Sequence, residues 1–179
     1  MLRSLVGSEM CIRDRDVGES MNRDAPELTH DAMGRMYLRM VEVAAPQLVT
    51  ALNVIAHTPG TAAFHCAAGR DRTGVVAAML LLALGAADDD IVADYALTGG
   101  NMVAIMQRTA PVMGAMWKAL GFDAGAAGAS AALLEGSMEV SMRTLLDTLR
   151  EQHGDALAPL RAAGLSDATI TRLRERALV

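Results

Sequence analysis

The sequence predicts an α/β domain in which helices dominate and the central parallel sheet is incomplete. Apolar residues recur at helical spacing along most of the chain, which indicates a series of amphipathic helices. One segment, 61–65 in "TAAFHC", has the pattern of a short buried strand. A lone strand would leave its backbone N–H and C=O groups without partners. We therefore expect the natural protein to supply further strands before this segment, and expect the chain to be truncated at its N-terminus.

Composition and charge indicate a single domain with a sizeable core, and argue against a nucleic-acid-binding protein. The 179 residues are 52% hydrophobic and 21% charged, with a formal net charge of −5. Aromatic residues make up 3% whereas methionine occurs 13 times, so we expect Met, Leu, Val and Ala to form the core. The longest apolar run, 75–84, is too short to cross a bilayer, and we expect no transmembrane segment. Two cysteines and no His/Cys cluster favour neither a disulfide framework nor a metal, and no cofactor is expected.

The first fifteen residues differ from the rest of the chain. "MLRSLVGSEMCIRDR" resembles the translation of a transposon-type sequencing-library adapter. We expect 1–15 to be adapter-derived, with no role for Cys11, and 16–179 to be the C-terminal portion of one domain. A genuine N-terminal extension is the alternative. A cytoplasmic location is expected, and secretion stays open because an adapter-derived segment would stand in place of the native N-terminus and of any targeting signal in it.

The elements that follow are expected to be helices separated by turns. Apolar spacing from Asp31 predicts a helix that Pro46 ends, and then a second helix with Leu48, Leu52 and Ile55 on one face. Turns are expected at 57–60 and 98–101 and a loop at 121–130. Further helices are expected at about 73–84 (closed by Gly85), from 88, at 101–120 (interrupted by Pro111), at about 131–152, and at 166–178 with Ser166 as N-cap.

The stretch "HCAAGRDRTG" at 65–74 joins the expected strand to the helix at 73–84. Such a strand, loop and helix start place several backbone N–H groups around one concavity at the positive end of the helix dipole, and this nest binds a phosphate-sized anion. Ala67, Ala68 and Gly69 are small enough for the backbone to approach the ligand closely. Arg72 offers a planar fork of donors to two phosphate oxygens.

Cys66 stands at the base of this expected cradle. The field that attracts phosphate also lowers the pKa of a thiol, so we expect Cys66 to be largely thiolate near neutral pH. The implied reaction is attack of the thiolate on phosphorus, formation of a cysteinyl-phosphate, and its hydrolysis by water.

These residues match the His-Cys-x5-Arg-Thr/Ser-Gly signature of the cysteine-based protein tyrosine phosphatases. Within that group the stretch most closely resembles the atypical bacterial tyrosine and phosphoinositide phosphatases. The resemblance implies a three-layer protein-tyrosine-phosphatase-like α/β fold, with Cys66 as nucleophile and Arg72 as clamp on the phosphate and the transition state. It also implies that Thr73 hydrogen-bonds the sulfur and that His65 orients the loop. Asp71 is implied as the general acid, a role that a carboxyl beside the leaving oxygen suits.

The similarity extends to "DDDIVADYAL" and "LRAAGLSDATITRLRERAL", and covers most of residues 31–179. It implies phosphotyrosine proteins as substrates, with phosphoserine and phosphothreonine open, or phosphoinositides. The family's loop lysine, associated with polyanionic lipid headgroups, is replaced here by Arg70, which keeps the charge and changes the geometry. The family's Asn-Phe-Arg-Asp-type segment and first strands have no counterpart after Arg15. The implied phosphate-binding set is Ala67, Ala68, Gly69, Arg70, Asp71 and Arg72.

Other interpretations of these residues stay open. Cys66 alone would suit a core position, Asp71 a charge at a helix start, and Arg70 a surface cation. His30, His57 and His153 stand apart from one another and are expected to be solvated. A nucleotide-binding P-loop would need Lys and Ser/Thr after the second glycine, where the sequence has two valines. A sulfurtransferase would not need the Arg-Thr pair, and a non-catalytic phosphate-binding pseudophosphatase or an inactive fragment is the remaining alternative.

Overall fold

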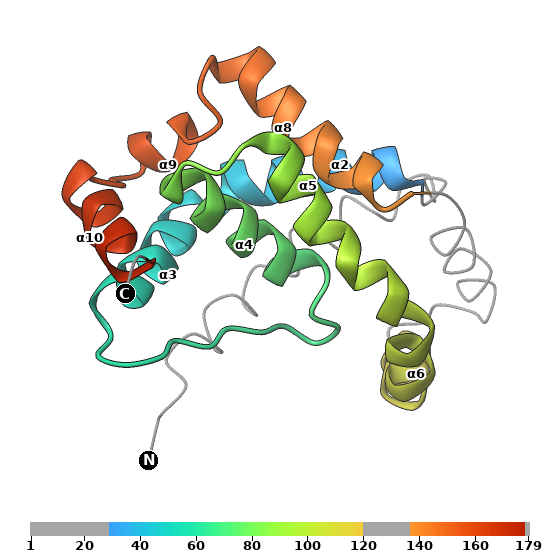
Figure 1. Cartoon of the computed structure of the whole chain (residues 1–179). Helices are drawn as coiled ribbons and strands as arrows, with labels where there is room; N and C mark the ends of the chain where they lie inside the picture. Colours follow the sequence, from blue (N-terminus) through green and yellow to red (C-terminus); the bar gives the residue numbers. More distant parts are fainter. Residues whose placement is uncertain (1–28, 120–136, 178–179) are drawn as a thin grey trace.

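A computed structural model describes residues 29–119 and 137–177, which form an assembly of helices (Figure 1). Helix α4 lies in the middle and packs against α2, α3, α5 and α10, so its first turn is held from several sides. The elements are α2 (His30–Val43), α3 (Ala45–His57), α4 (Asp71–Leu84), α5 (Asp88–Ala96), the 3-10 helix η1 (Leu97–Asn101), α6 (Met102–Ala119), α8 (Glu139–His153), α9 (Ala158–Ala162) and α10 (Asp167–Ala177).

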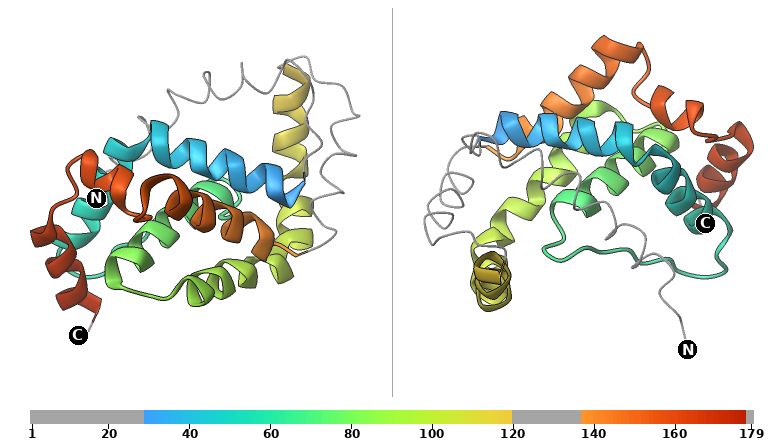
Figure 2. Two further views of the ribbon diagram at one scale, coloured as in Figure 1. Left: turned by 90° about the horizontal axis from the view of Figure 1, so that it is seen from above. Right: turned by 180° about the vertical axis from the view of Figure 1, so that it is seen from behind.

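Helices α2 and α3 confirm the first two predicted helices. The hydroxyl of Thr29 caps α2 by accepting a hydrogen bond from the Ala32 N–H at 3.1 Å. Pro46 lies in the first turn of α3, where its missing N–H has no intrahelical role. Helix α2 runs beside α8 (Figure 2), and Gly34 makes this approach possible because a Cβ there would lie 2.5 Å from Thr144 Cβ.

Helix α4, which begins at the candidate site, is deeply packed among its neighbours. Val75, Ala78 and Met79 are almost completely buried, as expected for the apolar run that the sequence shows. The helix ends at Gly85, which has a left-handed φ of 93° and whose N–H bonds the Leu81 carbonyl at 3.0 Å. The predicted glycine cap is therefore confirmed.

Helices α5 and α6 differ in how firmly they are held. Arg150 of α8 donates two hydrogen bonds to the carboxylate of Asp88 at the start of α5, at 2.6 and 2.5 Å. The expected turn at 98–101 lies within η1, and α6 continues through Pro111, so the predicted interruption does not end the helix. Helix α6 extends away from the other helices (Figure 2).

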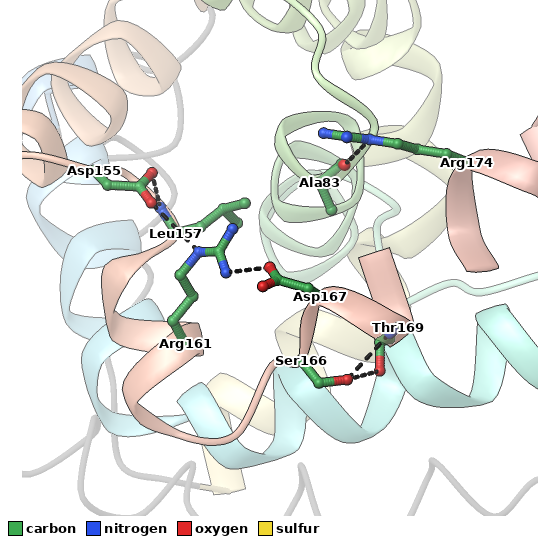
Figure 3. Close-up of polar contacts among 8 residues, drawn as sticks. All are labelled: Ala83, Asp155, Leu157, Arg161, Ser166, Asp167, Thr169 and Arg174. Atoms are coloured by element: carbon green, nitrogen blue, oxygen red, sulfur yellow. Dashed lines mark hydrogen bonds and ion pairs between the residues drawn. The ribbon is translucent and has the colours of Figure 1, made fainter. Parts of the chain in front are cut away.

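The C-terminal elements form a compact unit against α3 and α4 (Figure 3). Ser166 accepts a hydrogen bond from the Thr169 N–H at 3.1 Å, which confirms the predicted N-cap of α10. Arg161 bridges Asp155 and Asp167 across the turn between α9 and α10. The short helix α9 was not predicted, and the part of the predicted 131–152 helix before residue 137 lies outside the described residues.

The predicted strand at 61–65 is wrong for the described part of the chain. Residues 61–66 are irregular and lie largely on the surface, with Phe64 37% exposed. A strand exists only when a neighbour accepts its backbone hydrogen bonds, and no partner strand occurs in 29–119 or 137–177. The predicted α/β architecture with an incomplete parallel sheet is thus corrected to a helical arrangement for these ranges.

The core is built from the residue types that composition predicts. It contains Leu, Val, Ala and Met side chains from every helix that packs around α4, together with two buried tyrosines. His30 departs from the expectation of a solvated histidine, because it is 8% exposed and its Nδ1 lies 3.2 Å from Ser141 Oγ. Among the described helices none is alone long and apolar enough to cross a membrane; the bent pair α2–α3 passes that test only jointly, with 79° between its helices.

Candidate active site

The segment 65–70 carries the chain from the surface into the first turn of α4. Gly69 has a φ of +73°, a conformation that side-chain-bearing residues rarely adopt, so this turn requires glycine. Gly74 allows α5 to approach α4, because a Cβ at this position would lie 2.8 Å from a ring carbon of Tyr95. The glycines of the motif therefore serve the shape of the loop and the seating of the helix.

Cys66 is half-buried with its sulfur among hydrogen-bond donors of this loop. Burial alone would raise the pKa of the thiol. Thr73, through its hydroxyl and its N–H, and the N–H groups of Gly69 and Ala68 outweigh burial, so the pKa of Cys66 lies below its usual value of 9.0. This environment favours the nucleophilic thiolate.

The hydroxyl of Thr73 is buried and has no oxygen or nitrogen partner among the described residues. It is nevertheless close enough to Cys66 to be the strongest of the influences that lower the pKa of the thiol. The family resemblance implies that this hydroxyl hydrogen-bonds the sulfur, and that role stays a prediction.

Asp71 begins α4, and its carboxylate is turned toward α2. Its Oδ1 accepts a hydrogen bond from the Tyr37 hydroxyl at 2.6 Å, and the side chain is 33% exposed. Asp71 is therefore neither a freely solvated charge nor a fully buried one. The Tyr37 hydroxyl also lies 2.7 Å from that of Tyr95, which comes from α5.

Arg70 is buried, with 4% exposure, so the interpretation of a surface cation is wrong. Its Nε donates to the Tyr95 hydroxyl at 3.3 Å and lies 3.7 Å from Asp71 Oδ1. Burial alone would lower the pKa of Arg70, but Tyr95, Tyr37 and Asp71 together raise it above its usual value. One terminal nitrogen of the guanidinium is buried without a hydrogen-bond partner.

The other motif residues lie on the outer side of the loop or at the helix start. His65 is exposed, and its Nδ1 lies 3.2 Å from the Cys66 carbonyl oxygen. Ala67 is exposed and Ala68 is half-buried. Arg72 is half-buried in the first turn of α4. The structure thus brings the whole implied set together around the junction of loop and helix.

A cavity of about 100 Å³ adjoins this junction and runs between α4 and α5. Residues of the loop, of α4 and of α5 line it, and they include both apolar and polar side chains. Its lining includes Gly69, Thr73, Gly74, Leu81, Asp94 and Tyr95.

Sequence reasoning missed Tyr37 and Tyr95 as parts of the site. They are the two tyrosines of the chain, and both are almost fully buried. A buried tyrosine hydroxyl needs a polar partner, so a tyrosine at a core position of a predicted helix is a usable signal for a polar cluster. The partner itself could not be read from the sequence, because it comes from another helix.

The sequence is similar to that of known phosphatases. The sequence pattern of the Tyrosine phosphatase family matches residues 10–179. The chain is 33% identical over 113 residues, 62% of its length, to the triple specificity protein phosphatase PtpB of Mycobacterium tuberculosis, and this match covers 41% of that protein. It is 35% identical over 69 residues, 38% of its length, to a tyrosine-protein phosphatase of Nostoc commune, of which 24% is covered. The chain therefore spans less than half of the length of either relative.

Proposed function

This chain belongs to the tyrosine phosphatase family, and on that premise we propose that it hydrolyses phosphate monoesters through a cysteinyl-phosphate. The observation that carries the proposal is the environment of Cys66: a half-buried thiol of lowered pKa, with the N–H groups of Ala68, Gly69 and Thr73 directed at the sulfur. The same N–H groups suit the oxygens of a bound phosphate. Nucleophile and anion site are then one structure.

The proposed reaction has two steps. The Cys66 thiolate attacks phosphorus, the ester P–O bond breaks, and the leaving alkoxide or phenoxide takes a proton from Asp71. Arg72 stabilises the charge that gathers on the phosphoryl oxygens. Water then attacks the cysteinyl-phosphate, gives its proton to Asp71, and releases inorganic phosphate and the thiolate, which the Thr73 hydroxyl stabilises.

Phosphotyrosine proteins are the substrate class that we propose. Phosphoinositide headgroups carry several phosphates and call for further exposed cations near the loop. Arg70, which occupies the position of the family's lysine, is buried among Tyr95 and Asp71 and does not offer such a cation. Phosphoinositide hydrolysis is therefore the alternative, and rates on a soluble phosphoinositide and on a phosphotyrosine peptide separate the two.

The test compares Cys66→Ser with Cys11→Ser, a matched control that alters the other cysteine of the chain. Cys66→Ser should lower the rate on 4-nitrophenyl phosphate by at least about a thousandfold, whereas Cys11→Ser should leave it unchanged. Trapping of a phosphorylated Cys66 after acid quench would identify the intermediate. Substantial turnover by Cys66→Ser would sink the mechanism.

The role of Asp71 needs a separate experiment, because its contacts also suit a charge held at the start of a helix. Asp71→Asn should slow phenyl phosphate, whose leaving group needs a proton, by about a hundredfold. It should slow 4-nitrophenyl phosphate far less. Equal losses on the two substrates would assign the acid to another residue.

A non-catalytic phosphate-binding protein is the alternative from another functional class. It would use the same N–H groups and Arg72 but would form no covalent bond. Such a protein would bind inorganic phosphate or vanadate, and the bound anion would protect Cys66 from alkylation. It would release no burst of product from 4-nitrophenyl phosphate. A stoichiometric burst of 4-nitrophenol in the first turnover would favour the enzyme.

A further inference from the structure

Four polar side chains from three separate parts of the chain meet behind the loop. Tyr37 comes from α2, Arg70 and Asp71 from the end of the loop and the start of α4, and Tyr95 from α5. Their contacts close into a ring: 2.6 Å from the Tyr37 hydroxyl to Asp71 Oδ1, 2.7 Å between the two hydroxyls, and 3.3 Å from Arg70 Nε to the Tyr95 hydroxyl. Arg70 Nε closes it at 3.7 Å from Asp71 Oδ1.

The direction of every hydrogen bond in this ring is fixed by chemistry. A guanidinium only donates and an ionised carboxylate only accepts. Tyr95 therefore accepts from Arg70 and must donate its one proton to Tyr37, which donates its own proton to Asp71 Oδ1. The pKa of Tyr37 lies well above its usual value, because burial and then the charge of Asp71 disfavour the phenolate. Tyr37 thus remains a donor throughout the working pH range.

The two phenols are held in place by packing as well as by hydrogen bonds. Tyr37 is 0% and Tyr95 4% exposed. Their rings meet edge to face, with centroids 6.1 Å apart and planes at 78°. The ring of Tyr95 also lies against Gly74, where a Cβ would come within 2.8 Å. Both phenols have little room to move, so the position of the Tyr37 hydroxyl, which donates to Asp71, is fixed.

The ring of hydrogen bonds involves one carboxylate oxygen of Asp71 and does not involve the other. Oδ1 receives the Tyr37 proton and lies nearest to Arg70, whereas Oδ2 takes part in none of these contacts. A carboxyl whose Oδ1 is permanently an acceptor carries its own proton on Oδ2. The side chain is 33% exposed, so part of the carboxyl group faces solvent at the start of α4, next to the loop.

We propose that Tyr37 and Tyr95 are positioning residues for Asp71: they fix Oδ1 so that Oδ2 delivers the proton to the leaving oxygen. This rests on the proposed function, in which Asp71 is the general acid. In the first step the Oδ2–H bond breaks as the leaving oxygen gains the proton and the P–O bond opens. In the second step Oδ2 recovers a proton from the attacking water, and the Tyr37–Oδ1 hydrogen bond persists throughout.

The first test measures how strongly each variant depends on the leaving group. Tyr37→Phe should lower kcat on phenyl phosphate by about tenfold and on 4-nitrophenyl phosphate by less than about twofold. Tyr95→Phe should act in the same direction and less, because it is one hydrogen bond further from Asp71. Ser141→Ala is the matched control: it removes a fully buried hydroxyl, bonded to His30 rather than to Asp71, and should change both rates equally.

A second measurement avoids any dependence on how well the phenylalanine variants fold. Replacing tyrosine biosynthetically by 3-fluorotyrosine alters the two hydroxyls of this ring and no other, because the chain has two tyrosines. We expect the ratio of the rate on phenyl phosphate to the rate on 4-nitrophenyl phosphate to differ between the fluorinated and the ordinary protein. The pH profile of that ratio should differ as well. An unchanged ratio would overturn the proposal.

The outcomes separate this proposal from the one on which it rests. If Cys66→Ser stays active, the proposed reaction fails. If Asp71→Asn shows no dependence on the leaving group, the acid assignment fails and the positioning role fails with it. Suppose that Asp71→Asn shows that dependence, but that Tyr37→Phe and the fluorinated protein change the rates on phenyl phosphate and 4-nitrophenyl phosphate by the same factor or not at all. Only the positioning role then fails.

Discussion

Both ends of α4 carry polar groups that need hydrogen-bond partners, but those groups find their partners differently. At the C-terminal end, Gly85 turns the chain and its N–H bonds the Leu81 carbonyl, while Arg174 of α10 donates to the Ala83 carbonyl at 3.0 Å (Figure 3). At the N-terminal end no side chain caps the helix, one buried guanidinium nitrogen of Arg70 lacks a partner, and the buried Thr73 hydroxyl has only the Cys66 sulfur beside it.

This difference fits the proposed function, which places a phosphate at the N-terminal end of α4. Native proteins leave few buried polar atoms unpaired, so the exceptions call for an explanation. Of the three such atoms in the described part of the chain, two lie in the loop and first turn of α4 and the third is Gln47 Oε1. In the proposed function, a phosphate would supply acceptor oxygens to the backbone N–H groups at this end of the helix, whereas carbonyl groups at the C-terminal end already have donors within the protein.

The largest expected effect is at the N-terminal end. Gly74→Ala should destabilise the fold by about 1–3 kcal/mol, because the added Cβ meets the ring of Tyr95 at 2.8 Å. It should also lower kcat, since it displaces the ring beside Asp71. Gly85→Ala is the matched control at the other end: its φ of +93° makes alanine cost about 1–2 kcal/mol, without a change in kcat of the folded protein. Equal kcat for both variants would break the comparison.

The next effect appears at alkaline pH. The pKa of buried Tyr37 is raised by burial and by Asp71, so the native state keeps a proton that the unfolded chain releases above pH 10.0. Stability is therefore complete below that pH and should fall above it by about 1.4 kcal/mol per pH unit. Urea unfolding at about pH 9 and pH 11 measures the fall. Tyr37→Phe should show a smaller slope, and an equal slope would contradict the assignment.

A smaller effect is expected at the C-terminal end. Arg174→Met removes the donor to the Ala83 carbonyl but keeps much of the aliphatic stem. Because Arg174 is exposed and water can replace the hydrogen bond, we expect a loss of about 0.5–1 kcal/mol in the free energy of unfolding. The affinity for vanadate, measured by inhibition, should not change. A weakened affinity would show that the two ends of α4 are coupled.

The smallest effect is a displacement along the pH axis rather than a loss. In a Cys11→Ser background, the alkylation rate of Cys66 by iodoacetamide should rise with pH to a midpoint below 9.0. Thr73→Val should move that midpoint upward, because the hydroxyl is the largest of the influences that lower the pKa. Denaturation in urea should restore the ordinary value. A native midpoint at or above 9.0 would contradict the described cradle.

The sequence predicted what local pattern controls and failed where distant partners decide. Apolar periodicity and caps such as Ser166 located most helices, because both act within a few residues. The helix α9 has five residues, too few for a periodic signal. The strand at 61–65 was wrong because pairing depends on a neighbour that a local pattern does not contain.

The candidate site divides in the same way. The motif predicted Cys66, Arg72 and Thr73 as site residues, because their spacing within one loop can be read directly from the sequence. The burial of Arg70 and the part played by Tyr37 and Tyr95 were not predictable, because these contacts join α2, α4 and α5. The sequence motif located the charged residues of this loop. Which of them are buried depends on tertiary packing.

The arginine near the end of α10 has a consequence for the loop that carries the cysteine. Arg176 donates to the carbonyl oxygens of Thr58 and Gly60, where the chain leaves α3, from a position 118 residues beyond Thr58. The span from Gly60 to Arg70 is thereby tethered at both ends, by this arginine and by Tyr95. A tethered span has far fewer conformations to lose than a free one when it closes around an anion. In the proposed function, part of the affinity for phosphate would then depend on Arg176, which lies in another helix and contacts the chain only where it leaves α3.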